Sequence, residues 1–289
     1  MTHFVSIVVP TRNRAALLRD CLESLIAQEY PRECFEVIVV DDGSMDETTE
    51  VAGFFSERIA APRVRLVRKP PGGLNSARNA GIAIARGDPI CLVDDDVATP
   101  AGWLQAMVAG SLRYPDAGCL GGAIRLRLEG RPPRLCGREP IGETELDLGP
   151  EDRDGVLVWG ANMAIRRAAL ELVGLFDTGL SGPGDEQEWE ERLLERGGRV
   201  VYIAEAWLWH RRTAVDLQFL RMLKRRFARG AHVVPYRRAR GGPTPRVGNE
   251  LVAATRVLGH ALLHRCAWGV LAAAAHLGAA WATLSAGDR

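Results

Sequence analysis

Short apolar runs alternate with amphipathic stretches along roughly the first 100 residues of the chain. The apolar runs are rich in β-branched residues, which favour strands, and they lie at residues 5–9, 37–40, 64–67 and 90–93. Apolar positions recur at helical spacing in residues 15–28, 46–57 and 75–86. Strands that alternate with helices of about 10–15 residues are typical of βαβ units. This part therefore predicts a doubly wound α/β fold with a mostly parallel sheet.

The pattern changes twice farther along the chain. The middle is less regular, with an alternating strand-like run at residues 125–128, helical spacing at residues 185–196 and another strand-like run at residues 200–203. Residues 215–229 then combine apolar positions with many bases, and an Ala- and Leu-rich region begins at Leu251. We expect residues 213–289 to form a helical extension that follows the α/β part.

The basic segment of this extension has two interpretations. Eleven Arg or Lys residues and one acid, Asp216, lie between Arg211 and Arg246. The bases form either the solvated face of a helix or a contact with an anionic membrane, where each contributes about 1 kcal/mol. We favour peripheral membrane contact through residues 213–240. No nucleic-acid partner is expected, because no aromatic base-reading motif accompanies the charge.

Residues 266–287 are the second candidate for membrane contact, because these 22 residues include no Asp, Glu, Lys or Arg. That length can span a bilayer. Only Val270, Leu271, Leu277 and Leu284 favour insertion strongly, and together they supply only about 2 kcal/mol. The composition therefore favours a packed or interfacial helix over a transmembrane span.

Composition excludes several classes of protein. The 289 residues are 47% hydrophobic and 25% charged, as in an ordinary globular protein, and the net charge of +1 does not indicate a general nucleic-acid binder. The six cysteines are widely spaced and include no C-x-x-C pair, so neither a zinc ribbon nor a disulfide framework is expected. Pro10 to Arg14 end the first apolar run too early for a signal peptide. We expect a cytoplasmic protein with reduced thiols.

Three consecutive carboxylates carry the strongest chemical signal. Asp94, Asp95 and Asp96 follow the apolar run 90–93 directly, so they lie at the carboxyl end of a buried strand. Ligands of open α/β sheets bind at that end. A divalent cation with oxygen ligands would offset the mutual repulsion of the three side chains. The alternative is a solvated acidic turn.

A second acidic pair, Asp41 and Asp42, ends the run 37–40. One interpretation is a turn that caps the next helix, for which Ser44 with Glu47 three residues later has the spacing of a capping box. Because capping needs only one such residue, the other interpretation is that a carboxylate of the pair accepts hydrogen bonds from a base or ribose edge. The loop with Gly72 and Gly73 that leads into the third helix predicts backbone N–H groups available to phosphate. It is neither a P-loop nor a G-x-G-x-x-G loop.

Acids also begin the predicted helix at residues 185–196, where Asp185 and Glu186 follow Gly182 and Gly184. Acids at a helix N-terminus are ordinarily stabilising. The glycines suit a loop that approaches another group closely, and a carboxylate there could serve as a general base.

Four segments taken together resemble glycosyltransferase family 2. They are residues 5–13 (VSIVVPTRN), 39–44 (VVDDGS), 77–79 (ARN) and 92–96 (LVDDD). The resemblance covers about residues 4–212. It implies a GT-A fold, a Rossmann-like and mostly parallel sheet flanked by helices, over residues 1–212. The nucleotide-binding half would occupy about residues 1–100 and the acceptor-side half about residues 101–212, followed by the extension 213–289.

The same resemblance implies the site on the donor side. The residues matched to nucleotide-sugar binding are Pro10, Thr11, Arg12, Asp42, Arg78, Asn79, Asp94 and Asp95. Among them, Asp42 matches the carboxylate that binds the nucleotide base. Asp96 matches the last residue of the DxD motif, which coordinates Mn²⁺ or Mg²⁺. His210 matches a position that touches the metal or the diphosphate in some members.

On the acceptor side the resemblance implies a loop and a base. Trp159, Gly160 and Asn162 resemble the acceptor loop. Asp185 and Glu186 stand where the family usually has Glu followed by Asp, whose Asp is the catalytic base. The reversed order assigns the base to Glu186, with Asp185 as its rival.

The implied activity is metal-dependent, inverting transfer of a sugar from a nucleotide-diphosphosugar. We expect a UDP-sugar donor, a glycan or lipid-linked acceptor hydroxyl and a role in envelope glycan, polysaccharide or glycolipid synthesis, at the inner face of the cell membrane. One alternative is a nucleotidyltransferase that makes sugar nucleotides, although its usual Gly- and Lys-rich loop is missing near the first strand. A non-catalytic nucleotide-sugar binding module is the other.

Overall fold

The computed structural model describes residues 3–58, 60–136, 144–180, 182 and 184–287. The chain forms two compact units. The first, here called the sheet unit, comprises Met1–Arg127, Thr144–Gly179 and Glu186–Arg211. The second, the helical unit, comprises Leu128–Glu143, Leu180–Asp185 and Arg212–Arg289.

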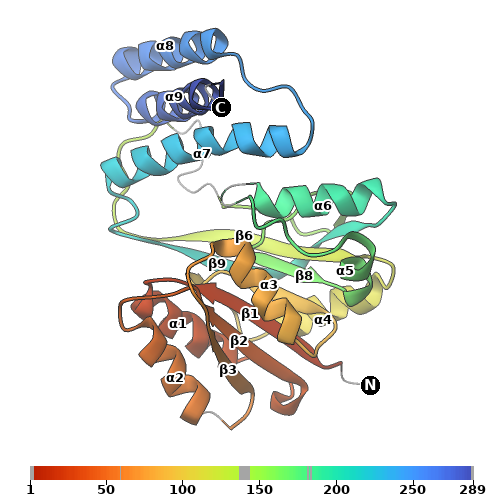
Figure 1. The fold of residues 1–289 in the computed structure, drawn as a ribbon. Coiled ribbons are helices and arrows are strands. Elements are labelled where there is room, and N and C mark those ends of the chain that lie inside the picture. Colours follow the sequence, from red (N-terminus) through yellow and green to blue (C-terminus); the bar gives the residue numbers. More distant parts are fainter. Residues whose placement is uncertain (1–2, 59, 137–143, 181, 183, 288–289) are drawn as a thin grey trace. The chain divides into compact units, whose positions relative to one another are not determined.

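The sheet unit begins with the predicted alternation of strands and helices (Figure 1). Its first half contains β1 (Val5–Thr11), α1 (Ala15–Ile26), the short 3₁₀ helix η1 (Arg32–Cys34), β2 (Phe35–Asp41), α2 (Thr48–Arg58), β3 (Arg63–Arg68), α3 (Leu74–Ile84) and β4 (Ile90–Val93). Strands β1, β2 and β4 are buried along their whole length, which explains their largely apolar sequences.

The second half of the sheet unit adds shorter and longer strands to the same sheet. It contains β5 (Val97–Ala98), α4 (Trp103–Arg113), β6 (Cys119–Glu129), β7 (Arg153–Asp154), β8 (Asn162–Ile165), α5 (Arg167–Val173), α6 (Asp185–Glu195) and β9 (Val200–Thr213). Within the described residues the sheet has nine strands in the order β3-β2-β1-β4-β8-β6-β9-β5, with β7 paired to β9.

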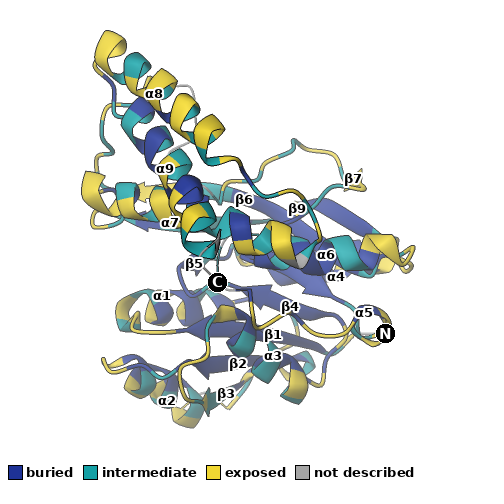
Figure 2. Cartoon of the chain, turned by 45° about the horizontal axis from the view of Figure 1, so that its top comes forward, coloured by how far each residue is buried: buried dark blue, intermediate teal, exposed yellow. Residues whose placement is uncertain are grey.

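Parallel and antiparallel pairing divide this sheet. β1 pairs in parallel with β2 on one side and with β4 on the other, and β2 pairs in parallel with β3. β8 then pairs antiparallel with β4. One face of the sheet is covered by α1, α2 and α4, through residues such as Leu22, Phe55 and Leu104. The other is covered by α3, α5 and α6, through residues such as Ile82, Ala169 and Trp189. The buried strands between these layers are visible in Figure 2. The predicted α/β fold is therefore confirmed, but the sheet is mixed and not mostly parallel, because β8 pairs antiparallel with β4 and β6, and β9 with β5 and β7.

The helical unit contains α7 (Phe219–Ala239), α8 (Val247–His264) and α9 (Trp268–Gly287). α9 packs on both α7 and α8. Close approach of α9 and α7 depends on glycine, because a Cβ added at Gly230 would collide with the carbonyl oxygen of Ala275, and one at Gly278 with that of Phe227. The expected C-terminal helices are thus present.

One helix within the described residues, over Trp268–Ala286, is long and apolar enough to cross a membrane, judged by length and composition only. In its most apolar window 39% of the residues are buried inside the structure.

Two helix starts differ from expectation. The capping box at Ser44 is not formed, because α2 begins at Thr48 and the Ser44 hydroxyl instead accepts the backbone N–H of Asn13 at 2.9 Å. The basic helix begins at Phe219 and not at residue 215, because Thr213 and Asp216 first form a turn in which the Thr213 hydroxyl donates to Asp216 Oδ2 at 2.7 Å.

Candidate functional site

The order of the strands places the candidate site. β1, β2 and β3 extend the sheet in one direction, and β4 returns to the opposite side of β1. Such a switch between neighbouring parallel strands opens a crevice at their carboxyl ends, where ligands of open α/β sheets bind. Thr11 is the last residue of β1, and Asp94 directly follows β4. Two of the segments predicted to bind the nucleotide-sugar therefore meet at the switch point.

Hydrogen bonds join these two strand ends. The Thr11 hydroxyl donates to Asp95 Oδ2 at 2.7 Å. Arg14 Nη1 donates to Asp95 Oδ1 at 3.0 Å and to Asp96 Oδ2 at 2.8 Å. Burial raises the pKa of Asp95 to about 7, against the opposing charge of Arg14. The acidic triplet is thus a largely buried, hydrogen-bonded turn and not a solvated one.

Arg14 was missing from the residues predicted for the site. In the sequence its signal is weak, because it follows the apolar run as one of two arginines in a polar loop. In the structure Asn13 has a left-handed φ of 54°, and the turn directs Arg14 to the carboxylates. Arg12, which was predicted to bind the nucleotide-sugar, lies exposed in this loop, and Pro10 is buried within β1.

The predicted metal residues come together with a third ligand. One ligand atom each from Asp94, Asp96 and His210 lies within 4.8 Å of the other two. His210 Nε2 is 3.2 Å from Asp96 Oδ1 and 3.8 Å from Asp94 Oδ2. His210 belongs to β9, and its pairing with Val97 of β5 carries it to the acidic loop. Two carboxylates with one imidazole are a donor set that fits Mn²⁺ well and Mg²⁺ less well.

The guanidinium of Arg78, on α3, acts on this cluster through its charge. Burial by itself would raise the pKa of Asp94, but the hydrogen bond from His210 and the charges of Arg78 and Arg14 hold it below its ordinary value. Arg78 is 3% exposed and lies over the ring of Phe176, 5.5 Å from its centroid. Its Nη1 donates to Asn75 Oδ1 at 3.1 Å.

Asn79 and Asn75 hold the segment under Arg78. The Asn79 side chain donates to the Phe176 carbonyl at 2.8 Å and accepts the Phe176 N–H at 3.1 Å. Asn75 Nδ2 donates to the carbonyl of Asp177 at 2.9 Å. The two asparagines lie one turn apart on α3, and together they fix residues 176 and 177 against this helix. This geometry favours a positioning role for Asn79.

Glu186 and the acceptor loop are neighbours in the sheet unit. The backbone N–H of Gly160 donates to Glu186 Oε1 at 3.4 Å. A Cβ added at Gly160 would collide with the guanidinium of Arg78, so the loop, the carboxylate and the arginine converge. Asp185 is 3% exposed, and its backbone N–H donates to the Gly182 carbonyl at 3.1 Å within the helical unit. The structure therefore brings Glu186, the predicted base, to the predicted acceptor loop.

The other two acceptor-side residues differ in accessibility. Trp159 is half-buried, and its indole N–H donates to the Glu145 carbonyl at 3.4 Å. Asn162 is fully buried, with its amide nitrogen bonded to the carbonyls of Ala123 and Ala206 and its oxygen accepting from Trp103. This bonding favours a positioning role for Asn162 inside the sheet.

The glycine loop is used differently from the expectation. The N–H groups of Gly72 and Gly73 donate to the two carboxylate oxygens of Asp42 at 2.8 and 2.9 Å. Lys69 Nζ also donates to Asp42 Oδ1 at 2.6 Å. These N–H groups were expected to be available to phosphate, but the folded loop uses them to hold Asp42. Asp41 instead stabilises the following turn by accepting from Ser44 and Thr49.

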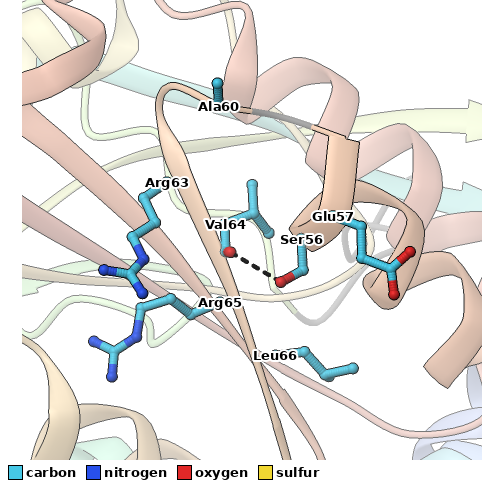
Figure 3. Close-up of a pocket in the computed structure, with 7 residues that line it drawn as sticks. All are labelled: Ser56, Glu57, Ala60, Arg63, Val64, Arg65 and Leu66. Carbon is cyan, nitrogen blue, oxygen red and sulfur yellow. Dashed lines mark hydrogen bonds between the residues drawn. The ribbon is translucent and has the colours of Figure 1, made fainter.

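An open pocket elsewhere in the sheet unit is unrelated to these residues. It lies between the end of α2 and the beginning of β3, and Figure 3 shows the Ser56 hydroxyl donating to the Val64 carbonyl inside it. Its lining residues are Ser56, Glu57, Ala60, Arg63, Val64, Arg65 and Leu66. Because this is the amino end of an edge strand, the pocket is remote from the switch point.

Comparison with known proteins identifies the family of this chain. Residues 6–174 match the family model described as Glycosyl transferase family 2, more than half of the chain. The chain belongs to glycosyl transferase family 2. The family match includes the acidic triplet and the acceptor loop but ends before Glu186 and His210. The predicted family 2 transferase is thereby confirmed.

Relatives and solved structures agree with this membership. The "Probable glycosyltransferase YdaM" of Bacillus subtilis is 27% identical over 80% of this chain and 56% of that protein. The "Glucosyl-dolichyl phosphate glucuronosyltransferase" of Haloferax volcanii is 27% identical over 78% of this chain and 75% of that protein. The chain thus spans little more than half of the first relative. A mannosyltransferase from Pyrobaculum calidifontis, solved with GDP-Man and Mn²⁺, superposes with a TM-score of 0.59 at 24% identity, over 100% of this chain and 80% of that one. This likeness confirms the GT-A fold.

Proposed function

We propose that this family 2 member transfers a sugar from a nucleotide-diphosphosugar to an acceptor hydroxyl, with inversion and with the help of a divalent cation. The observation that carries the proposal is the convergence of carboxylates, Arg78 and Glu186 in the sheet unit. Glu186 lies at Gly160, Gly160 adjoins Arg78, and the charge of Arg78 acts on Asp94. Donor-side and acceptor-side groups are therefore side by side.

The donor side would hold the nucleotide and its diphosphate. Asp94, Asp96 and His210 would bind Mn²⁺ or Mg²⁺, which when bound acts as a Lewis acid toward the departing nucleoside diphosphate. Arg78 adds a positive charge that favours the same leaving group. Thr11 and Arg14 hold Asp95, and thereby the loop of the DxD motif, in place. Asp42, held by Gly72 and Gly73, would face the base of the nucleotide.

The acceptor side would supply the base. Glu186 would remove the proton from the acceptor hydroxyl as that oxygen attacks the anomeric carbon, and Asp185 remains the rival for this role. A positioned carboxylate base typically contributes about 10²–10⁴-fold to the rate. The bond from Gly160 to Glu186 couples the position of the base to the acceptor loop.

For the substrates we propose a UDP-sugar donor and a glycan or lipid-linked acceptor in envelope glycan, polysaccharide or glycolipid synthesis. A lipid-linked acceptor accords with peripheral attachment of residues 213–240 to an anionic membrane on the cytoplasmic side. The exposed bases Arg221 and Lys224 and the exposed apolar Leu220 on α7 support this attachment. Such a mixture of bases and apolar side chains binds the interface of anionic bilayers.

Thermal unfolding with nucleotides tests the donor site. We expect UDP, among UDP, GDP, dTDP and CMP, to raise the unfolding temperature only when Mn²⁺ is present. Ligand at about 100 times its Kd stabilises the native state by about 2.7 kcal/mol. Asp96→Ala should abolish the effect, and Asp116→Ala, an exposed carboxylate paired with Arg199, should retain it.

The products of the complete reaction test the chemistry. Release of a nucleoside diphosphate together with a glycosylated acceptor supports the proposal. Release of pyrophosphate would instead show a nucleotidyltransferase. Donor binding without transfer to any acceptor hydroxyl would support the non-catalytic module. If no nucleotide stabilises the protein with or without Mn²⁺, the donor site is not as proposed.

A further inference from the structure

Two cysteines and a histidine converge in the helical unit, and sugar transfer uses none of them. His260 Nε2 is 3.2 Å from the sulfur of Cys136 and 3.3 Å from the sulfur of Cys266. The three ligand atoms all lie within 4.8 Å of one another. Both sulfurs belong to free thiols. The imidazole nitrogen therefore contacts both thiols.

The chain reaches this arrangement through the end of α8. His260 lies one turn before the last residue of α8, and Arg265 follows with φ 46° and ψ 44°. This left-handed residue ends the helix, and Cys266 comes back beside His260. The Ala267 N–H donates to the Arg134 carbonyl at 2.9 Å, which ties the segment carrying Cys136 to the same corner.

The distances suit a tetrahedral metal site. Zn–S bonds of about 2.3 Å and Zn–N bonds of about 2.0–2.1 Å separate neighbouring ligand atoms by roughly 3.5–3.8 Å. The two observed sulfur–nitrogen distances, 3.2 and 3.3 Å, are slightly shorter, and a small outward shift would admit the ion. A disulfide between the cysteines gives the ring nitrogen no part, whereas a shared metal ion would bind the nitrogen and both sulfurs.

His264 lies close enough to serve as a fourth ligand. His264 lies four residues after His260 on the same face of α8, and the two ring centroids are 4.3 Å apart. His264 is exposed, so its ring can turn without leaving a packed core. The ring of Trp268 covers His260 edge-on from another side, with centroids 5.1 Å apart.

We propose that Cys136, His260 and Cys266 bind Zn²⁺ in the helical unit, with His264 or a water molecule as the fourth ligand. The ion joins the segment before residue 137 to the corner between α8 and α9, so its role is structural. Thiolate and imidazole are the ligands that zinc prefers at such sites. This proposal is independent of the donor site, whose carboxylates and His210 offer no sulfur.

Cobalt substitution tests the site on the full-length chain. The reduced, chelator-treated protein is titrated with Co²⁺, and we expect a thiolate-to-cobalt charge-transfer band that saturates at about one ion per chain and disappears when Zn²⁺ is added. Cobalt bound at Asp94, Asp96 and His210 does not give this band, because none of these three ligands is a thiol, and the buried Cys21 beside them donates its S–H to the Asp94 carbonyl. The absence of the band from the reduced protein would overturn the proposal.

Cysteine variants provide the second comparison. Cys136→Ser and Cys266→Ser should each weaken Zn²⁺ binding by roughly 100-fold or more, because loss of an outer-shell partner alone costs about 10–100-fold. Cys34→Ser, a half-buried cysteine of the sheet unit, should bind as the unchanged chain does. Cys136 is exposed, so its replacement by serine leaves the fold intact.

Two results would contradict the zinc site. One is an unchanged cobalt band in the Cys136→Ser/Cys266→Ser double variant. The other is a Cys136–Cys266 disulfide in the isolated protein together with no cobalt binding after reduction. Neither result would affect nucleotide-dependent stabilisation, so failure here is distinguishable from failure of the proposed transfer.

Discussion

At the scale of single residues, the acidic triplet depends on side chains from separate strand ends. Thr11 comes from β1, Arg14 from the loop after it, and His210 from β9. Thr11 and Arg14 donate hydrogen bonds to carboxylates that repulsion would otherwise displace, and His210 Nε2 lies 3.2 Å from Asp96 Oδ1. A buried carboxylate left without such a donor costs more than the bond itself contributes. The triplet therefore retains its geometry only when the whole sheet has formed.

The first residue-scale prediction concerns the base. Glu186→Gln should lower kcat by about 10²–10⁴-fold and leave the stabilisation by nucleotide and Mn²⁺ unchanged, because the amide cannot accept the acceptor proton. Single-turnover transfer assays with the matched variant Asp185→Asn check it. Transfer that survives in Glu186→Gln and is lost in Asp185→Asn would assign the base to Asp185.

A second residue-scale prediction concerns the pH dependence of stability. Glu190 is fully buried in α6 and accepts the Val158 N–H at 2.9 Å. Burial raises the pKa of Glu190 to about 8 in the folded protein. The unfolded chain has a glutamate pKa of about 4.3, so between the two values the folded state binds the extra proton. The free energy of unfolding should therefore fall as pH rises through this window.

The comparison is with Glu190→Gln, which stays neutral at every pH and retains the acceptor for Val158. Urea unfolding from about pH 5 to about pH 8 should show a smaller loss of stability in this variant than in the unchanged chain. Glu195→Gln, on an exposed position of the same helix, serves as the control and should keep the slope. If the free energy of unfolding falls equally with pH in all three proteins, Glu190 has the same pKa in the folded and unfolded chain, and the prediction is wrong.

At the scale of elements, α7 and α9 pack closely because glycines lie at their contact. Gly230 and Gly278 permit backbone-to-backbone approach between these helices, where any side chain would meet a carbonyl oxygen. The glycines lower the intrinsic helix propensity, and packing has to compensate for that loss. The stability of the helical unit should therefore respond to size at these positions.

Gly278→Leu should destabilise the helical unit by roughly 1–3 kcal/mol, the usual cost of overpacking. The matched control is Gly259→Ala in α8, where an added Cβ has no neighbour within 4 Å. That change should stabilise the helix by about 0.5–1 kcal/mol, because alanine has the higher helix propensity. Chemical unfolding followed by circular dichroism measures both. Equal effects at the two positions would contradict close packing.

The basic face of α7 gives a further prediction at this scale. Reversing the charges of exposed Arg221 and Lys224 should weaken flotation with anionic vesicles by roughly tenfold or more per residue, since each base contributes about 1 kcal/mol and its replacement is repelled. Arg19→Glu with Arg63→Glu changes the net charge equally on exposed positions of the sheet unit and should leave flotation unchanged. No flotation of the unchanged chain with anionic lipid would end the membrane proposal.

At the scale of the whole molecule, the two units have different kinds of core. The sheet unit buries aliphatic and aromatic side chains on both faces of its sheet. The helical unit relies on small residues such as Ala273 and Ala280 between its helices. Chains with several compact units commonly depart from two-state unfolding. We therefore expect two transitions in scanning calorimetry.

Ligands should distinguish the two transitions. Nucleotide with Mn²⁺ should raise the temperature of the transition that belongs to the sheet unit. Zn²⁺ should raise the temperature of the transition that belongs to the helical unit, because each ligand stabilises only the native unit that binds it. Gly278→Leu should lower the temperature of the transition that responds to Zn²⁺. A single transition that shifts as a whole with either ligand would show that the units unfold together.

The first half of the sheet unit was predictable from the sequence because local forces decide it. Runs rich in β-branched residues favour buried strands, and the amphipathic stretches between them have to cover the faces of the sheet. The Asp94–Asp96 triplet was recognisable for a similar reason, since three acids at a buried strand end require a partner. Its position relative to β4 follows from the chain itself.

Helix starts were less predictable. Ser44 has the right residue type and spacing for a cap, but a more distant donor, the Asn13 backbone, uses its hydroxyl. The same is true of Gly72 and Gly73, whose N–H groups bind Asp42. The local sequence predicts which hydrogen bonds a group is able to make, but the tertiary structure decides which partner it bonds.

The amino-acid sequence by itself determined the order of strands and helices, the family and the acidic motif, because these depend on periodicity and on neighbouring residues. The resemblance had already matched His210 to the metal or diphosphate site, and the structure brings it to a triplet more than a hundred residues earlier. Only the tertiary structure added Arg14 to the carboxylates. It also brought Cys136 to His260, 124 residues away. Side chains so far apart in the chain become neighbours only after the packing of strands and helices has closed the long loops between them.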